Sequence, residues 1–226
     1  MNCDPIARWY QWFEYIGFGG ELERRRNEFL SEVAGARRIL VLGEGDGRFL
    51  VKLVEQNQGA SIDYVDLSSR MLALARSRAG DSVTYHHADA RTFRLPTAEY
   101  DLIVTHFFLD CFNETDAASL INRLADSTSD NTRWLISEFR QPARGWRAMW
   151  ARAWLTTLYF FFRITTGLET STLVNHHPLL ERAGFRQILH QSSHFNLLAS
   201  ELWGRPPACQ SRRVTSSDTS SRTLGS

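Results

Sequence analysis

The chain has 226 residues, of which 43% are hydrophobic and 12% are aromatic, and its formal net charge is +1. This length fits one α/β domain with additions, and the near-zero charge offers no general electrostatic attraction for nucleic acid. The three cysteines, Cys3, Cys111 and Cys209, lie far apart and are odd in number, so neither a disulfide framework nor a zinc site is expected.

The amino-terminal segment, residues 5–34, is predicted to form one or two helices. Pro5 suits a first helical turn, and apolar residues recur at three- and four-residue spacing as far as Ile16. A glycine-rich stretch separates them from a charged helix expected at Glu21–Val33. The aromatic side chains of this segment either pack against the core or cover a ligand cleft, and in the second case residues 1–35 form a helical lid.

The start of the chain also bears on its location. Asp4 and Trp9 do not suit the charged and then apolar regions of a secretory signal. No apolar stretch reaches the roughly 18 residues that a membrane span requires. We therefore expect a cytoplasmic protein.

A strand followed at once by a glycine-rich turn is predicted at residues 38–50. The run Arg38–Leu42 suits a buried parallel strand, and helical spacing begins at Phe49. Between them glycines alternate at positions 43, 45 and 47. Glycine adopts backbone dihedrals that a Cβ forbids and lets a bulky ligand approach the backbone. The following helix directs its free N–H groups and positive dipole end toward such a ligand.

The spacing of these glycines separates two kinds of nucleotide site. It does not match the dinucleotide fingerprint, whose sixth position would fall on Arg48 or Leu50. The pattern Gly-x-Gly-x-Gly instead resembles motif I of the class I S-adenosylmethionine-dependent methyltransferases. A second strand, Ile62–Asp66, ends in an acid about 20 residues later, where a carboxylate can accept both hydroxyls of a ribose.

Three later stretches extend the resemblance to this family. Residues 65–72, Val-Asp-Leu-Ser-Ser-Arg-Met-Leu, are similar to the family pattern Val-Asp-x-Ser-x-x-Met-Leu. Tyr85–Ala90 is similar to the motif that contacts adenine, and Tyr100–His106 is similar to the motif on the fourth strand. The resemblance covers roughly residues 36–203.

The resemblance implies that the cofactor is S-adenosyl-L-methionine. The family usually carries an acid two residues before the first glycine, where this chain has Val41, and Glu44 inside the turn is expected to take over part of that polar role. No metal is expected. The implied cofactor-binding residues are Gly43, Glu44, Gly45, Gly47, Asp66, Leu67, Met71, Asp89, Ala90 and Thr105.

Strands and helices alternate between residues 36 and 139, which predicts right-handed crossovers and a parallel sheet covered on both faces. The later strands Phe185–Gln191 and Phe195–Trp203 are separated by only three residues, which requires an antiparallel hairpin. We therefore expect an α/β, Rossmann-like, doubly wound sheet, with the seven strands that the resemblance implies. The predicted elements before residue 140 are the strands Arg38–Leu42, Ile62–Asp66, Val83–His86, Leu102–Thr105 and Trp134–Glu138 and the helices Phe49–Gln56, Arg70–Arg78 and Ala117–Ala125.

Catalytic candidates follow the fourth strand, where the family forms its substrate pocket. A sulfonium methyl group is already activated toward in-line displacement, so the protein aligns the acceptor and, where the acceptor is protonated, supplies a base. His106 suits that base, although a lone histidine there can equally be a structural hydrogen-bond partner. Asp110 either orients the imidazole or caps the following turn. Phe107 and Cys111 flank these candidates, and Glu138 is expected to face the same crevice.

The segment Arg140–Leu168, within a helical insert of about residues 140–172, contains five arginines, no acid and aromatic residues at helical spacing. Such a helix either buries its aromatic stripe in the protein or lies on a membrane surface with its arginines near the headgroups. Both alternatives point to an apolar acceptor, which Trp150 or Tyr159 is expected to contact. Nucleic acid would need a broader basic face.

Two features of the remaining chain complete the predictions. His176 and His177 either border the substrate mouth or face solvent, and without two further ligands they do not indicate a metal site. Residues 204–226 lack apolar periodicity and are predicted to be disordered, outside the domain at residues 36–203.

The sequence therefore predicts a methyltransferase that acts on a small hydrophobic or aromatic molecule. Two alternatives stay open: a membrane-surface enzyme with a lipid or quinone-like substrate, and a non-catalytic subunit that binds the cofactor for a partner. No oligomeric state is predicted.

Overall fold

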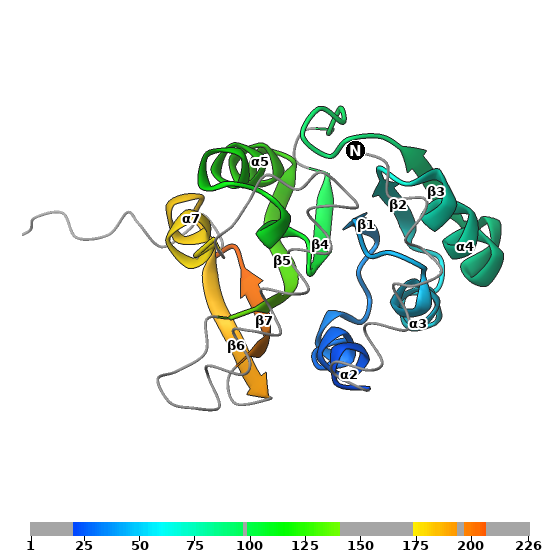
Figure 1. The fold of residues 1–226 in the computed structure, drawn as a ribbon, viewed down its shortest axis with the longest axis horizontal. Coiled ribbons are helices and arrows are strands. Elements are labelled where there is room, and N and C mark those ends of the chain that lie inside the picture. Colours follow the sequence, from blue (N-terminus) through cyan, green and yellow to red (C-terminus); the bar gives the residue numbers. More distant parts are fainter. Residues whose placement is uncertain (1–19, 97–98, 141–173, 194–196, 207–226) are drawn as a thin grey trace, which may run out of the picture.

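The computed structural model describes residues 20–96, 99–140, 174–193 and 197–206, which form a seven-stranded sheet with helices on both faces (Figure 1). The strand order is β3-β2-β1-β4-β5-β7-β6. Strands β1 to β5 run parallel, and β7 is antiparallel to both of its neighbours. The strands are β1 (Arg38–Leu42), β2 (Ser61–Asp66), β3 (Val83–His87), β4 (Tyr100–His106), β5 (Thr128–Phe139), β6 (Arg186–Ser193) and β7 (Leu198–Gly204).

Two apolar cores lie between the sheet and its helices. Helices α5 and α7 cover one face, and α3 and α4 cover the other, as Figure 1 shows. Helix α2 packs against β5, β7 and α3. The helices are α2 (Glu21–Asn27), α3 (Arg48–Gln56), α4 (Ser69–Ala79), α5 (Glu114–Asp126) and α7 (His177–Arg182), with 3-10 turns η2 (Ser31–Val33), η3 (Gly80–Ser82) and η4 (Leu109–Cys111).

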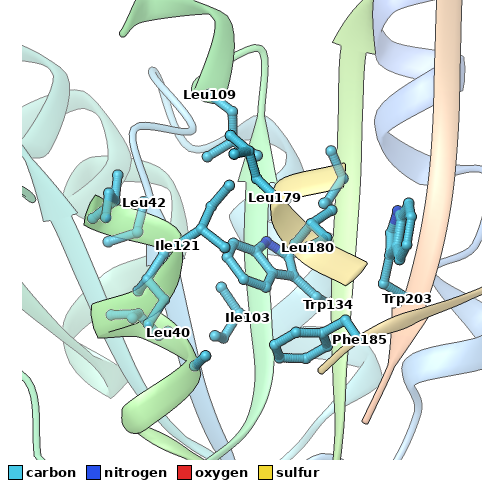
Figure 2. Close-up of a cluster of buried hydrophobic side chains, with 14 of the residues drawn as sticks. Leu40, Leu42, Ile103, Leu109, Ile121, Trp134, Leu179, Leu180, Phe185 and Trp203 are labelled. Carbon is cyan, nitrogen blue, oxygen red and sulfur yellow. The ribbon is translucent and has the colours of Figure 1, made fainter. Parts of the chain in front are cut away.

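Strand β1 is apolar throughout because its alternate side chains enter different cores. Leu40 and Leu42 belong to the cluster under α5 and α7 (Figure 2), whereas Ile39 and Val41 belong to the cluster under α3 and α4. A strand covered on both faces needs apolar residues at every position. The turn that follows β1 is therefore anchored to the most buried part of the sheet.

The predicted doubly wound sheet and its terminal antiparallel hairpin are confirmed. Two predicted boundaries differ by six residues, and Gly204, which was placed in the predicted disordered tail, instead ends β7. The charged helix ends at Asn27, where the side-chain amide donates to the Glu23 carbonyl at 2.6 Å and so competes with the helical backbone bond. Strand β5 begins at Thr128 and not at Trp134. The polar residues before Trp134 suggest a loop, but their hydroxyls bond to neighbouring segments: that of Thr132, for example, donates to the Tyr100 carbonyl at 2.7 Å.

Several predictions concern residues outside those that the structure describes. They are the helix at residues 5–16, the basic helix with Trp150 and Tyr159, and the tail after residue 206. The helical lid, the domain boundaries and the membrane-surface alternative thus stay predictions. Among the described helices, none combines the length and the apolar character that crossing a membrane would take.

Candidate functional site

The carboxyl ends of the parallel strands meet at one edge of the sheet. Leu42 at the end of β1 is paired with Val65 on β2 and with Thr105 on β4. Asp66 pairs with His87 at the end of β3. The chain runs from β1 to β2 and β3 on one side and returns to β4 on the other, so the edge beside β1 is a topological switch point, where open α/β sheets bind ligands.

The three glycines after β1 all have positive φ angles, 58° at Gly43, 93° at Gly45 and 84° at Gly47. A Cβ on Gly43 would lie 2.3 Å from the Phe108 ring, and one on Gly47 would lie 2.5 Å from the Ala75 Cα atom. At Gly45 a Cβ would meet no atom of the described residues within 4 Å. The outer glycines therefore permit close packing inside the protein, whereas the backbone at Gly45 is accessible to a ligand.

Glu44 serves the helix that follows the turn. It is 3% exposed, and its Oε1 atom accepts a hydrogen bond from the Phe49 N–H in the first turn of α3 at 3.2 Å. An acceptor at this position satisfies a donor that has no partner within the helix. The carboxylate thus stabilises the strand-to-helix connection and sits inside the glycine turn, as the sequence placed it.

Asp66 is tied to the glycine turn through Tyr64. The Tyr64 hydroxyl donates to the Gly45 carbonyl at 2.5 Å and lies 3.5 Å from Asp66 Oδ2, while Asp66 Oδ1 accepts from the Ser68 N–H at 2.8 Å. Burial raises the pKa of Tyr64 well above its ordinary value, so the hydroxyl stays protonated and can donate. Burial likewise raises the pKa of Asp66 to about 6. The turn and the acid are therefore held as one unit.

Asp89 follows β3 and is held by its neighbour Arg91. The Arg91 Nη2 atom lies 2.6 Å from Asp89 Oδ2, and the Arg91 N–H donates to Asp89 Oδ1 at 2.9 Å. The side-chain hydrogen bond from Arg91 lowers the pKa of Asp89, which is therefore an ionised acceptor. Its carboxylate is partly exposed beside the end of β3.

The other predicted cofactor contacts lie at the same edge and differ in what they can offer. The carbonyl of Leu67 is 2.9 Å from His87 Nε2, and the N–H of Met71 donates to the Ser68 hydroxyl that caps α4. Ala90 and Met71 are buried. Thr105 is fully buried, and its hydroxyl accepts from Trp134 Nε1 at 2.9 Å. Its side chain is therefore bonded to Trp134, a residue of the core shown in Figure 2.

His106 ends β4 on the face that α3 covers. It is 2% exposed, and its ring stands edge-on to Phe49 with the centroids 4.6 Å apart. Burial, together with the charge of Arg26, lowers the pKa of His106 well below 6.5, so the imidazole is neutral. Neither ring nitrogen has a hydrogen-bond partner among the described residues. The hydrogen bond by which Asp110 was expected to orient this ring is therefore not formed.

Asp110 instead belongs to a buried pair of carboxyl groups with Glu138 at the end of β5. The two residues are 6% and 2% exposed, and Asp110 helps to raise the pKa of Glu138. Glu138 Oε1 also accepts from the backbone N–H groups of Phe108 and Leu109 at 3.1 and 2.8 Å. The pair thus fixes the loop between β4 and α5, on which the catalytic candidates lie.

Comparisons with known proteins agree with this geometry. Residues 39–131 match the family described as a methyltransferase domain. A curated demethylmenaquinone methyltransferase from Thermus thermophilus is 30% identical over 134 residues, which cover 58% of this chain and 60% of that protein. The matched region contains the glycine turn, Asp66 and Asp89. This chain spans 60% of the length of the curated relative that it matches.

Solved structures share the fold of this chain at low sequence identity. The N-methyltransferase NodS from Bradyrhizobium japonicum, in complex with S-adenosylhomocysteine, has a TM-score of 0.60 and 14% identity, with 84% of this chain and 88% of that chain covered. An S-adenosylmethionine-dependent methyltransferase from Mesorhizobium loti has a TM-score of 0.61 and 21% identity, with 83% and 97% covered. The [4+2]-cyclase SpnF has a TM-score of 0.59 and 14% identity, with 81% and 82% covered.

A second polar cluster lies at the start of α7. His176 Nε2 and His177 Nε2 are 3.1 and 2.8 Å from the oxygens of Glu201, which is 1% exposed. These groups could in principle ligate a metal, since their ligand atoms lie within 4.8 Å of one another. However, the Arg140 guanidinium pairs with Glu201 Oε1, the oxygen that also faces His177, and lies 2.9 Å from His177 Nε2. A fixed cation there repels a metal ion, so we interpret the cluster as an ion-pair network.

Three residues, Tyr64, Glu138 and Glu201, were not assigned these roles from the sequence. Tyr64 could have been found, because it stands two residues before Asp66 and side chains at that spacing share a face of the strand. The partnership of Glu138 with Asp110 and that of Glu201 with two histidines join residues far apart in the chain, and no local pattern indicates them.

Proposed function

We propose that this chain binds S-adenosylmethionine at the turn between β1 and α3 and transfers its methyl group to a small hydrophobic or aromatic acceptor. The observation that carries the proposal is the Tyr64 hydroxyl, which joins the Gly45 carbonyl to the region of Asp66. It holds the accessible backbone of the turn and a ribose-binding acid at fixed separation beside the switch point.

The residues present fit this cofactor. Gly45 has room for a ligand against its backbone, and the half-buried carboxylate of Asp66 can accept two ribose hydroxyls. Asp89 provides a further ionised acceptor after β3, at the position where the resembling family contacts adenine. When bound, the cofactor would supply a methyl group on a positively charged sulfur, already activated toward a nucleophile. The chain's own task is to align the acceptor and remove its proton.

An apolar cluster at the same edge supports an apolar acceptor. Its buried members are Leu22, Leu197 and Leu198, and Phe107 and Phe139 pack against them. The rings of the two phenylalanines have centroids 4.9 Å apart, at the ends of β4 and β5. The relative from Thermus thermophilus is named for a quinone substrate, demethylmenaquinone, which belongs to the same chemical class.

We also propose that His106 accepts the proton of the acceptor. Its ring nitrogens bond to no described residue, so they are available to accept a proton, although burial and the charge of Arg26 lower its pKa and make it a weaker base than a free imidazole. With S-adenosylmethionine bound, the imidazole would take the proton that the acceptor loses as its lone pair bonds to the methyl carbon and S-adenosylhomocysteine leaves. His106→Gln should lower the transfer rate about 10²–10⁴-fold and leave cofactor affinity near the wild-type value.

Calorimetry with S-adenosylhomocysteine tests the cofactor step. We expect saturable binding that Asp66→Ala weakens at least about tenfold, because charge-assisted hydrogen bonds are worth about 1.5–3 kcal/mol each. Asp81→Ala is the matched control, since the side chain of Asp81 is 89% exposed beyond the far end of α4. A folded wild-type protein that does not bind would overturn the proposal.

The acceptor class is tested separately with S-adenosylmethionine labelled in its methyl group. The purified chain is offered a panel of apolar quinols, phenols and amines, including demethylmenaquinol, beside polar acceptors of similar nucleophilicity. We expect label to enter the apolar members preferentially. Transfer only to polar acceptors would contradict the substrate class and leave the methyltransferase assignment intact.

A further inference from the structure

The buried carboxyl pair of Glu138 and Asp110 has a function that the cofactor site alone does not explain. A carboxyl group placed in a protein interior needs hydrogen bonds to offset its lost hydration. Glu138 has two, both accepted by Oε1 from consecutive backbone N–H groups, those of Phe108 and Leu109. One side chain at the end of β5 thus holds the first turn of the chain after β4.

Two carboxylates in contact cannot both be charged in a buried site. Burial, reinforced by the neighbouring Asp110, raises the pKa of Glu138 well above its ordinary value, although the two backbone N–H groups act in the opposite direction. Burial and Asp110 thus both favour the protonated form of Glu138. In this state Oε1 remains a carbonyl oxygen that can accept both backbone bonds.

The loop fixed in this way reaches the cofactor turn. Glu138 accepts a hydrogen bond from the backbone N–H of Phe108. The ring of Phe108 packs on Gly43, so that a Cβ added to Gly43 would lie 2.3 Å from the nearest ring atom. The preceding residue, Phe107, has a φ of 52°, a conformation that costs a bulky side chain energy and must be held by its surroundings. Phe107 also belongs to the apolar cluster at the proposed acceptor side.

We propose that Glu138, paired with Asp110, is a positioning residue for methyl transfer: it holds the β4–α5 loop so that Phe108 packs on the cofactor turn while Phe107 faces the acceptor side. This inference rests on the proposed function. It assigns to Asp110 a supporting role in the loop.

Two substitutions of similar size distinguish the effect of losing the hydrogen bonds from the effect of changing the side-chain volume. Glu138→Gln keeps a carbonyl oxygen for both N–H groups, whereas Glu138→Leu removes it. We expect Glu138→Leu to lower kcat at saturating acceptor by about 10²-fold, the usual effect of misplacing reacting groups by about 1 Å, and to weaken S-adenosylhomocysteine binding. Glu138→Gln should keep most of the wild-type kcat and of the wild-type affinity for S-adenosylhomocysteine. Equal kcat and affinity in wild type and Glu138→Leu would overturn the inference.

A structural measurement keeps this result separate from the proposed function. Amide hydrogen exchange at Phe108 and Leu109 should be slow in wild type and Glu138→Gln and fast in Glu138→Leu, whether or not the protein transfers methyl groups. Unchanged protection in Glu138→Leu contradicts the positioning role. Absence of S-adenosylhomocysteine binding by wild type contradicts the proposed function instead.

If Glu138→Leu does not fold, Phe108→Ala tests the same chain of contacts. It removes the ring from Gly43 and leaves both backbone bonds to Glu138 in place. We expect weaker S-adenosylhomocysteine binding and a lower kcat, and where both variants fold, effects in the double variant smaller than the sum of the two. Wild-type affinity and kcat in Phe108→Ala would overturn the inference.

Discussion

Asp66, the proposed ribose acceptor, has a raised pKa, which would make cofactor binding sensitive to mild acid. Accepting two hydroxyl hydrogen bonds requires the ionised carboxylate, which predominates only above a pH of about 6. We therefore predict that affinity for S-adenosylhomocysteine rises with pH between about 5 and 7 and is constant above that range. Calorimetry across this range measures it.

The variant Asp66→Asn is the control for this pH dependence. Its amide keeps one acceptor oxygen and does not titrate, so affinity should be lower than wild type and should change little over the same range. An unchanged pH dependence in Asp66→Asn would assign the titration to another group.

Gly45 allows steric exclusion of the ligand to be tested apart from backbone strain. Gly45 and Gly59 both have positive φ, 93° and 81°, and a Cβ on either meets no described atom within 4 Å. Valine at either position should destabilise the fold by about 1–3 kcal/mol. We predict that only Gly45→Val loses S-adenosylhomocysteine binding, measured by calorimetry beside urea unfolding. Equal binding in both variants would mean that Gly45 serves only the turn.

These residues also show what a sequence discloses about a site. The glycines, Asp66 and Asp89 were placed at one edge because each follows a predicted strand, and that rule depends only on local patterns. Glu138 was expected to face the crevice, yet its bonds to a loop 29 and 30 residues earlier depend on which strands are neighbours. Such partnerships follow from the folded arrangement and leave no periodic signal.

At the level of elements, Glu201 on β7 joins segments on either side of residues 141–173. Arg140 follows β5, and His176 and His177 begin α7; all three contact the one carboxylate, as does Trp203 Nε1 at 2.8 Å. Although burial raises it, the hydrogen bonds from His176 and His177 bring the pKa of Glu201 well below its ordinary 4.5. The stability it contributes is therefore present above about pH 4.5 and is lost as the pH falls below it.

We predict that Glu201→Leu lowers the free energy of unfolding at neutral pH by about 3–5 kcal/mol, because it removes the buried carboxylate that Arg140, His176 and His177 share. Urea unfolding measures this difference. Glu99→Leu is the matched control: Glu99 pairs with Arg38, both side chains are more than a third exposed, and its loss should cost about 1 kcal/mol or less. Similar costs for the two variants would contradict the network.

Element boundaries were harder to predict than element types. The alternation of apolar runs identified every described strand, but β5 was expected to begin six residues later, at Trp134, because its first residues are polar. They remain in the strand because hydroxyl and backbone bonds to neighbouring segments satisfy them. Tertiary hydrogen bonds of this kind override the local pattern.

For the whole molecule, cofactor binding should stabilise the fold, because the proposed site joins parts of β1, β2, β3 and β4. At a concentration 100 times the Kd, S-adenosylhomocysteine should add about 2.7 kcal/mol to the free energy of unfolding. A thermal-shift titration should show a rising Tm in wild type and little change in Asp66→Ala. A concentration-independent Tm in the wild-type protein would contradict specific binding to the folded state.

The position of β7 has a consequence for how the sheet is assembled during synthesis. Strand β6 is made before β7, yet its described neighbour in the sheet is β7, which enters between β5 and β6. While the ribosome adds residues up to Ser193, β6 has no strand to pair with and β5 is still an open edge, a state that favours pairing with other chains. By then the parallel strands β1 to β5 have all been synthesised. Strands β1 to β5 can therefore form their part of the sheet first, and β7 completes the sheet by inserting between β5 and β6.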